Sequence, residues 1–214
     1  MIVCGEQPIE FSTTKKTSSN KVIPMSRISW IVVAAACVIA VAMRLVSIPF
    51  MNFSAMGALA ILCGAVVRPI WLGLLIPLGC RALTDVVLEA KTGHGFYGSW
   101  MFDYAAYATM FALGRLVRPT NGASAFGTGL LAAACFFLIS NLGVWCMPQD
   151  GGQYLYPRTL AGLVTCFINA IPFARGTFFG DVGFSMLFFG ALQILALASP
   201  GKDTGSTKPA SVDA

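Results

Sequence analysis

The chain has 214 residues, of which 57% are hydrophobic and only 11% are charged, with a formal net charge of +5. Soluble domains are typically about 45–50% apolar and about 25% charged, so the composition argues against a water-soluble enzyme, a disordered chain and a nucleic-acid-binding module. A membrane span needs about 20 apolar residues, so the length leaves room for roughly six spans with short loops. It leaves none for a separate soluble catalytic domain.

Apolar stretches separated by short polar segments predict an all-α membrane protein with a single transmembrane domain over residues 28–198. The expected spans, in chain order, are 28–47, 52–67, 70–90, 98–117, 124–147 and 178–198. The first stretch is too long for the apolar core of a cleavable signal, so we expect it to be retained. The polar segments 1–27 and 199–214 are expected to be disordered cytoplasmic tails.

One further apolar stretch, 160–173, is shorter than a span and ends near Pro172. Its fourteen residues would form a helix of ~21 Å, against ~30 Å of hydrocarbon. We therefore predict a short extra helix, partly inserted or lying on the surface, before the last span. Seven spans remain the alternative.

The distribution of basic residues predicts the orientation. With six spans and the N-terminal tail inside, nine Lys and Arg residues lie on the cytoplasmic side and three in the outer loops. This bias follows the positive-inside rule. The expected location is the plasma (inner) membrane, with both termini in the cytoplasm.

Polar side chains within the spans indicate a site, because an ionisable group in a membrane usually faces a partner or a watery cavity. Arg81 and Asp85 are four residues apart and so share one helix face. With the predicted topology, polar groups from several spans converge in the outer half of the bundle. We expect them to line a small hydrated cavity that is open to the outside and binds a polar solute. The candidate substrate-binding residues are Arg81, Asp85, Asp103, Asn141, Trp145 and Asp181.

Each candidate has an expected role. Arg81 would anchor an anionic group of the solute, the carboxylates and Asn141 would orient its polar edges, and Trp145 would stack on a ring. Structural alternatives stay open. Arg81 and Asp85 have the spacing of an ion pair whose charges neutralise each other, without any role in binding. Asp103 and Asp181 lie near expected helix N-termini, where the helix dipole favours a carboxylate.

Other chemistries have little support in the sequence. No phosphate-binding loop, metalloprotease motif or nucleophile elbow is present, so neither a catalytic residue nor ATP hydrolysis by the chain itself is expected. One His and cysteines in apolar stretches predict neither a metal site nor a disulfide framework. A membrane enzyme that uses Asp85 and Asp103 as acid and base, and an ion-driven transporter working alone, are weaker alternatives.

Several segments carry a resemblance to a known group of proteins: NFSAMGALAIL (52–62), LTDVVLE (83–89), SNLGVW (140–145), YPRTLAGLVTCFINAIPF (156–173) and GDVGFS (180–185). The chain resembles an uncharacterised bacterial membrane-protein family that is similar to the substrate-binding (S) components of energy-coupling factor vitamin transporters. The resemblance covers roughly residues 50–190. YPRTLAGL is a feature of the uncharacterised family and not a general S-component signature.

The resemblance implies a bundle of six membrane helices with a ligand pocket towards the outer face. It also implies docking onto a transmembrane coupling protein driven by ATPases. Ala36 and Ala40 have the small-residue spacing that allows close helix packing, and the resemblance suggests that they dock this partner. The predicted function is binding and uptake of a small polar solute, such as a vitamin or precursor. The alternative is a structural or assembly protein of the membrane without a ligand.

Overall fold

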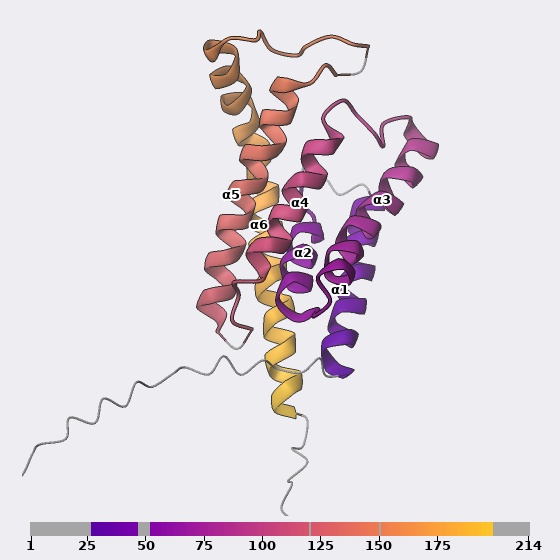
Figure 1. Cartoon of the computed structure of the whole chain (residues 1–214), viewed down its shortest axis with the longest axis vertical. Helices are drawn as coiled ribbons and strands as arrows, with labels where there is room; N and C mark the ends of the chain where they lie inside the picture. Colours follow the sequence, from indigo (N-terminus) through magenta and orange to yellow (C-terminus); the bar gives the residue numbers. More distant parts are fainter. Residues whose placement is uncertain (1–26, 47–51, 120, 150, 199–214) are drawn as a thin grey trace, which may run out of the picture.

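The computed structural model describes residues 27–46, 52–119, 121–149 and 151–198. The predicted tails, apart from Arg27, lie outside the described residues. Within these ranges the secondary structure is six helices and no strand, which confirms an all-α fold (Figure 1). The helices are α1 (Arg27–Leu45), α2 (Met56–Val66), α3 (Ile70–Thr92), α4 (Trp100–Gly114), α5 (Gly122–Cys146) and α6 (Leu160–Ala198).

Four of these helices, α1, α3, α5 and α6, are long and apolar enough to cross a membrane. Their outward faces carry large apolar side chains, such as Trp71, Leu131 and Ile168, that are more than half exposed. Such surfaces are stable in lipid and costly in water. By length and composition, the chain is therefore a multi-pass helical membrane protein.

The short helix α2 lies at the centre of the bundle, where it packs against every other helix (Figure 1). Its residues Met56–Gly64 are all buried, and small residues let the neighbouring helices approach closely. Eleven residues give a helix of ~16 Å, which is too short to cross ~30 Å of hydrocarbon alone. The structure therefore does not confirm 52–67 as a span, and the count of six spans stays a prediction.

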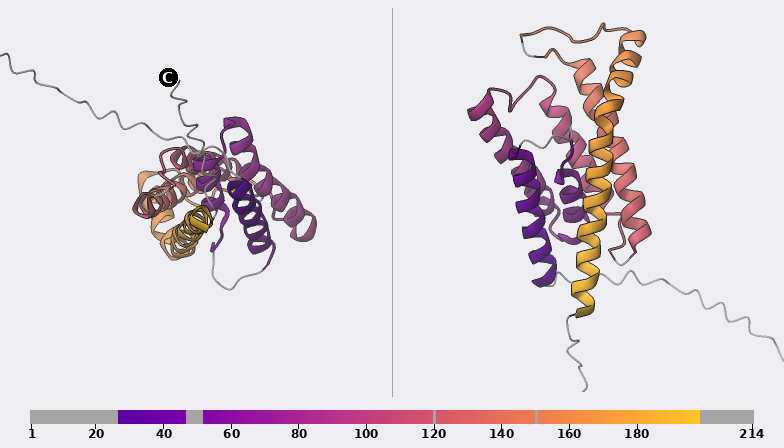
Figure 2. Two further views of the ribbon diagram at one scale, coloured as in Figure 1. Left: turned by 90° about the horizontal axis from the view of Figure 1, so that it is seen from below. Right: turned by 180° about the vertical axis from the view of Figure 1, so that it is seen from behind.

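The last helix corrects the prediction of a short extra helix over 160–173. α6 runs without a break for 39 residues and includes Pro172, so the predicted extra helix and the last span are one element (Figure 2, right). Proline removes one hydrogen-bond donor, but membrane helices tolerate it because neighbouring groups satisfy the freed carbonyl. At ~58 Å, α6 is longer than the hydrocarbon layer, and its first turns extend past the ends of α3 and α4 (Figure 1).

The two ends of the bundle differ. The start of α1 and the end of α6 lie together at the lower end in Figure 1, and the α3–α4 and α5–α6 loops lie at the upper end. This arrangement agrees with the predicted direction of each helix. Which end faces the cytoplasm stays a prediction.

Ala36 and Ala40 lie on the inner face of α1, and both are 0% exposed. They belong to the same apolar core as the residues of α2. This burial fits the close helix packing that their spacing predicts, and in this arrangement the chain's own core covers them, so neither residue is exposed to a partner.

The N-terminus of α2 lies inside the bundle, where its free N–H groups need acceptors. Ser54 Oγ accepts from the Met56 amide at 3.1 Å. The carboxylate of Asp181, on α6, accepts from the amides of Gly57 and Ala58. Asp181 thus caps α2 across the bundle and ties this helix to α6.

Gly57→Ala is expected to weaken this contact, because a Cβ at residue 57 would overlap the Asp181 carboxylate. Overpacking of this kind costs about 1–3 kcal/mol, so the thermal unfolding midpoint of the detergent-solubilised protein should fall. Gly79→Ala is the matched control: its Cβ would meet nothing within 4 Å, and alanine is the better helix former. Equal midpoints for the two variants would contradict the cap.

Candidate functional site

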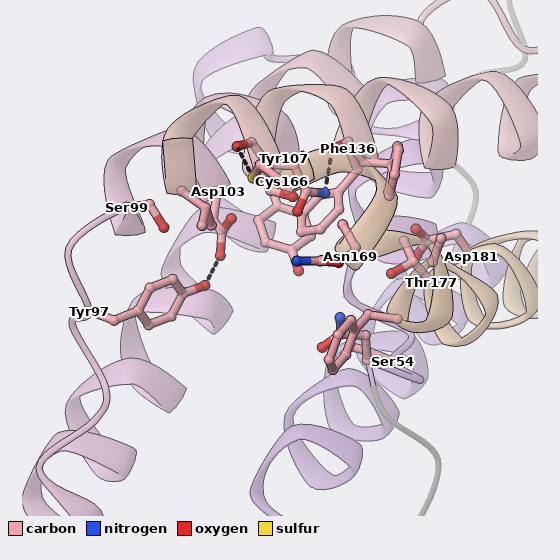
Figure 3. Close-up of a pocket in the computed structure, with 18 of the residues that line it drawn as sticks. Ser54, Tyr97, Ser99, Asp103, Tyr107, Phe136, Cys166, Asn169, Thr177 and Asp181 are labelled. Atoms are coloured by element: carbon pink, nitrogen blue, oxygen red, sulfur yellow. Dashed lines mark hydrogen bonds between the residues drawn. The ribbon is translucent and has the colours of Figure 1, made fainter. Parts of the chain in front are cut away.

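A cavity of about 330 Å³ lies between the helices (Figure 3). Residues of the α3–α4 and α5–α6 loops, at the upper end of the bundle in Figure 1, belong to its wall. All helices except α2 contribute to its wall, as do the segment before α2 and the two upper loops. Charged side chains line it from α1, α3, α4 and α6, and they are Arg44, Arg81, Asp103 and Asp181. Hydroxyl and amide groups make up much of the rest.

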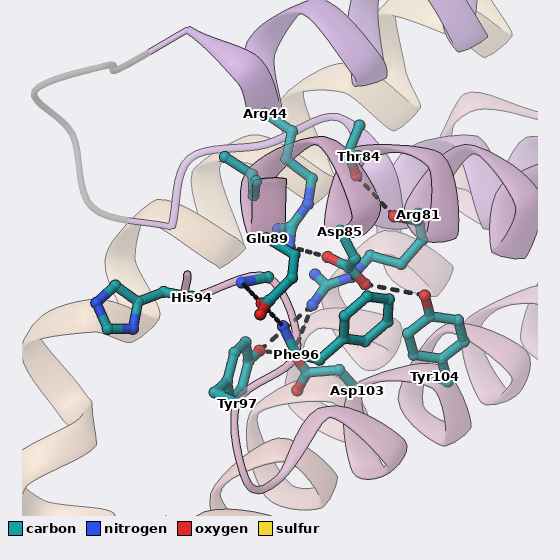
Figure 4. Close-up of polar contacts among 12 residues, drawn as sticks. Arg44, Arg81, Thr84, Asp85, Glu89, His94, Phe96, Tyr97, Asp103 and Tyr104 are labelled. Carbon is teal, nitrogen blue, oxygen red and sulfur yellow. Dashed lines mark hydrogen bonds and ion pairs between the residues drawn. The ribbon is translucent and has the colours of Figure 1, made fainter. Parts of the chain in front are cut away.

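Arg81 is the centre of the charged wall. It is only 2% exposed, so its charge must be balanced within the protein. Its Nε donates to Asp85 Oδ2 at 2.8 Å, one turn further along α3, and its Nη2 donates to Asp103 Oδ2 at 3.3 Å, on α4. The guanidinium therefore joins two helices through two carboxylates (Figure 4).

Three more side chains complete this network. Arg44 Nη2, from α1, donates to Asp85 Oδ1 at 2.5 Å, and the Tyr104 hydroxyl donates to Asp85 Oδ2 at 2.9 Å. The Tyr97 hydroxyl donates to Asp103 (Figure 4). Burial raises the pKa of the Tyr97 hydroxyl above its ordinary range, so Tyr97 stays a hydrogen-bond donor at neutral pH. We call Arg44, Arg81, Asp85 and Asp103, with Tyr97 and Tyr104, the ion network.

The ion network has no net charge, because two arginines face two aspartates. The Arg81 guanidinium also lies 5.5 Å from the ring centroid of Tyr107 and 5.9 Å from that of Tyr104. Ring faces attract cations and add to the stabilisation. These hydrogen bonds engage Arg81 with the protein, and this supports the interpretation of Arg81 and Asp85 as a structural pair.

Two donors on the cavity wall have no acceptor among the described residues. They are Arg44 Nε and the hydroxyl of Ser99, whose side chain is 0% exposed. An unsatisfied buried polar group costs about 1–3 kcal/mol. Because Arg44 and Ser99 both belong to the cavity wall, small side-chain rotations would let a molecule within the cavity supply the acceptor.

The opposite wall comes from α5 and α6 and is uncharged over most of its area. Phe136 and Phe137 present rings, and Asn141 and Asn169 present amides. Asn141 Nδ2 donates to the Phe137 carbonyl at 2.7 Å, which leaves its amide oxygen as an acceptor. This wall combines apolar surface with a few polar groups, as ligand sites generally do.

The structure brings together most, but not all, of the predicted site residues. Arg81, Asp103, Asn141 and Asp181 line the cavity. Asp85 is fully buried behind this wall and holds Arg44 and Arg81 in place. Trp145 does not line the cavity, so the expectation that it stacks on a ligand ring is wrong for this structure.

Trp145 instead fastens the loop between α5 and α6. Its Nε1 donates to the Pro157 carbonyl at 3.0 Å. The Arg158 guanidinium lies 4.9 Å from the ring centroid of Trp145 and 5.0 Å from that of Tyr154. The same loop contributes Leu155 and Tyr156 to the cavity wall, so these contacts hold a cover over the site.

Sequence reasoning missed several wall residues. Tyr97 lies in a predicted loop, Ser99 lies at the very start of the predicted span 98–117, and Asn169 lies in the stretch predicted as a partly inserted or surface helix. Arg44 carried a signal, because it is a charge near the end of an apolar stretch. Among the described residues, no group of three or more His, Cys, Asp or Glu side chains is placed to hold a metal ion.

Comparison with known proteins gives one match. A family model described as "Family of unknown function (DUF6580)" matches residues 25–202. No curated protein and no solved structure matches the chain. The matched range includes every residue of the cavity wall.

Arg81→Met is expected to destabilise the protein, because it leaves Asp103 buried without its cation. Removing one partner of a buried ion pair costs about 3–5 kcal/mol, which a thermal unfolding midpoint in detergent can measure. Adding Asp103→Asn should restore part of the loss. Arg175→Met, which changes an exposed arginine of α6, serves as the control. An unchanged midpoint for Arg81→Met would rule out the ion network as a structural element.

Arg158→Ala is expected to loosen the α5–α6 loop without unfolding the bundle. It removes two cation–π contacts and a hydrogen bond to the Cys146 carbonyl. Hydrogen–deuterium exchange over residues 151–159 should speed up, while exchange in α3 stays the same. Arg175→Ala is again the control. Unchanged exchange in the loop would show that Arg158 does not hold it.

Proposed function

Because the chain belongs to the DUF6580 family, whose function is unknown, we propose a function from the cavity itself: the protein binds a small polar solute within the membrane. The observation that carries this proposal is the pair of polar groups without partners, Ser99 Oγ and Arg44 Nε, on residues of the cavity wall. Burying donors without acceptors is costly. A bound solute that accepts from them offsets this cost.

The size and chemistry of the cavity support the same conclusion. Its volume of about 330 Å³ is at the lower end of the range for small-molecule sites, which is about 300–1,000 Å³. Rings of Phe136 and Phe137 can cover a flat apolar face, and Asn141 and Asn169 can pair with polar edges. Leu155 and Tyr156, in the loop between α5 and α6, complete the wall on this side.

Uptake is the process that such binding would serve. The sequence contains no phosphate-binding loop, so energy for transport would come from a partner or an ion gradient. An S-component-like role, in which the chain docks on a transmembrane coupling protein with ATPases, is our proposal for this partner. Since Ala36 and Ala40 are buried, that docking would use another face of the bundle.

One observation favours a second function, that of a structural or assembly protein without a ligand. The ion network satisfies its own charges and joins α1, α3 and α4. A network of this kind stabilises a bundle whether or not a solute binds. The two functions differ in whether filling the cavity changes anything besides stability.

A thermal-shift screen of small polar solutes on the detergent-solubilised chain tests the proposal. A ligand at 100 times its Kd should stabilise the protein by about 2.7 kcal/mol. Ala174→Phe, on the cavity wall, should abolish this shift, whereas Ala161→Phe, exposed on the same helix, should not. If no solute shifts the wild-type midpoint, or if Ala174→Phe retains the shift, the solute-binding function is wrong and the structural one is favoured.

A further inference from the structure

We infer that the solute carries no net charge and consists of a flat ring with a carbonyl-type oxygen. This inference rests on the proposed function, and it names the class of molecule that the cavity takes. The evidence is the state of each charged side chain on the cavity wall, the position of the unsatisfied donors and the rings of the opposite wall.

The charges of the wall all have partners within the protein. Arg81 is paired with Asp85 and Asp103, and Arg44 is paired with Asp85. Asp181 accepts from two backbone amides at the N-terminus of α2, where the helix dipole favours a carboxylate. Among the described wall residues, each carboxylate and guanidinium already has a partner in the protein, although Arg44 keeps one open donor, Nε.

A charged solute would therefore bring an unbalanced charge into a buried site. Taking an ion out of water without a partner is among the most costly steps in binding. An anion would have to share Arg44 with Asp85 or draw Arg81 away from two carboxylates, and a cation would have to draw a carboxylate from its donors. An uncharged solute needs neither change. This replaces the expectation that Arg81 anchors an anionic group.

The unsatisfied groups indicate what the solute presents to the charged wall. Arg44 Nε can only donate, whereas the Ser99 hydroxyl can donate or accept, and a carbonyl oxygen can accept from either group without carrying a charge. The Ser99 side chain is buried and belongs to a residue of the cavity wall, so a small rotation of this side chain would bring its hydroxyl to a molecule in the cavity. Figure 3 shows Ser99 beside Tyr97 and Asp103, at the charged side of the cavity.

The rest of the solute would meet the wall formed by α5 and α6. Rings of Phe136, Phe137 and Phe173 and the amides of Asn141 and Asn169 lie there. Flat rings stack on aromatic side chains, and their edges pair with amides. A cavity of about 330 Å³ has room for one or two rings.

Three probes that share one ring separate the possibilities: benzamide is uncharged, benzoate is an anion and benzamidine is a cation at neutral pH. Their binding to the full chain in detergent is measured by saturation-transfer NMR. The signal lost in Ala174→Phe is taken as binding in the cavity. If Ala174→Phe fails to fold, Val144→Trp, also on the wall, replaces it. Benzamide is expected to bind at least about tenfold more tightly than either charged probe, a difference of about 1.4 kcal/mol.

Ser99→Ala tests the acceptor. Loss of one hydrogen bond should weaken benzamide binding about 3- to 10-fold. Thr109→Ala removes a hydroxyl from α4 that bonds only within its own helix, and it should leave the affinity unchanged. An equal loss in both variants, or no loss in Ser99→Ala, would refute the role of Ser99 as donor to the solute.

The remaining outcomes also decide the matter. Cavity binding of benzoate or benzamidine at least as tight as that of benzamide overturns the inference about charge, while solute binding itself stands. If none of the three probes gives a cavity-dependent signal, the inferred ring class is wrong. The broader solute screen then decides separately whether the cavity binds anything.

Discussion

The buried guanidinium of Arg81 is the constraint on which the upper half of this bundle depends. A charge that is 2% exposed within a membrane protein is stable only with counter-charges at close range. Asp85 supplies one from the same helix and Asp103 supplies the other from α4. Because Asp85 also binds Arg44, the upper ends of α1, α3 and α4 are held in one arrangement. This arrangement of the three helices places the charged side chains together on one wall of the cavity.

A second constraint comes from α2, which ends inside the bundle. A helix N-terminus away from water needs acceptors for its N–H groups, and here Ser54 and Asp181 provide them. The short helix fills only part of the depth of the bundle. The space above it, between the ion network and the wall of α5 and α6, is the cavity. A carboxylate that lines a cavity can thus serve mainly to cap a helix.

These two constraints explain why the polar residues divide into two kinds. Asp85, Asp103 and Asp181 have their hydrogen bonds within the protein, and their first role is structural. Ser99 and Arg44 Nε lack acceptors and so are the groups left for a solute. The charge of the solute that the cavity favours therefore depends on how the charges of the wall balance one another, and not on the presence of an arginine.

The amino-acid sequence by itself determined the helical membrane class and the direction of the helices. It also indicated that the polar groups gather at one end of the bundle. These features can be read from the sequence because the length of an apolar stretch and the position of a charged residue are local properties of a chain. It identified Arg81, Asp103, Asn141 and Asp181, since a polar side chain in an apolar stretch is visible without a structure.

Only the tertiary structure decided how these groups pair, because pairing depends on distances between helices. It showed that α6 continues through Pro172, that Ala36 and Ala40 are covered by the core, and that Trp145 holds Arg158. It also revealed that Ser99, an ordinary serine at the start of a predicted span, has a buried hydroxyl without a hydrogen-bond partner. A hydrogen-bond deficit belongs to an arrangement in space, and no pattern along the chain records it.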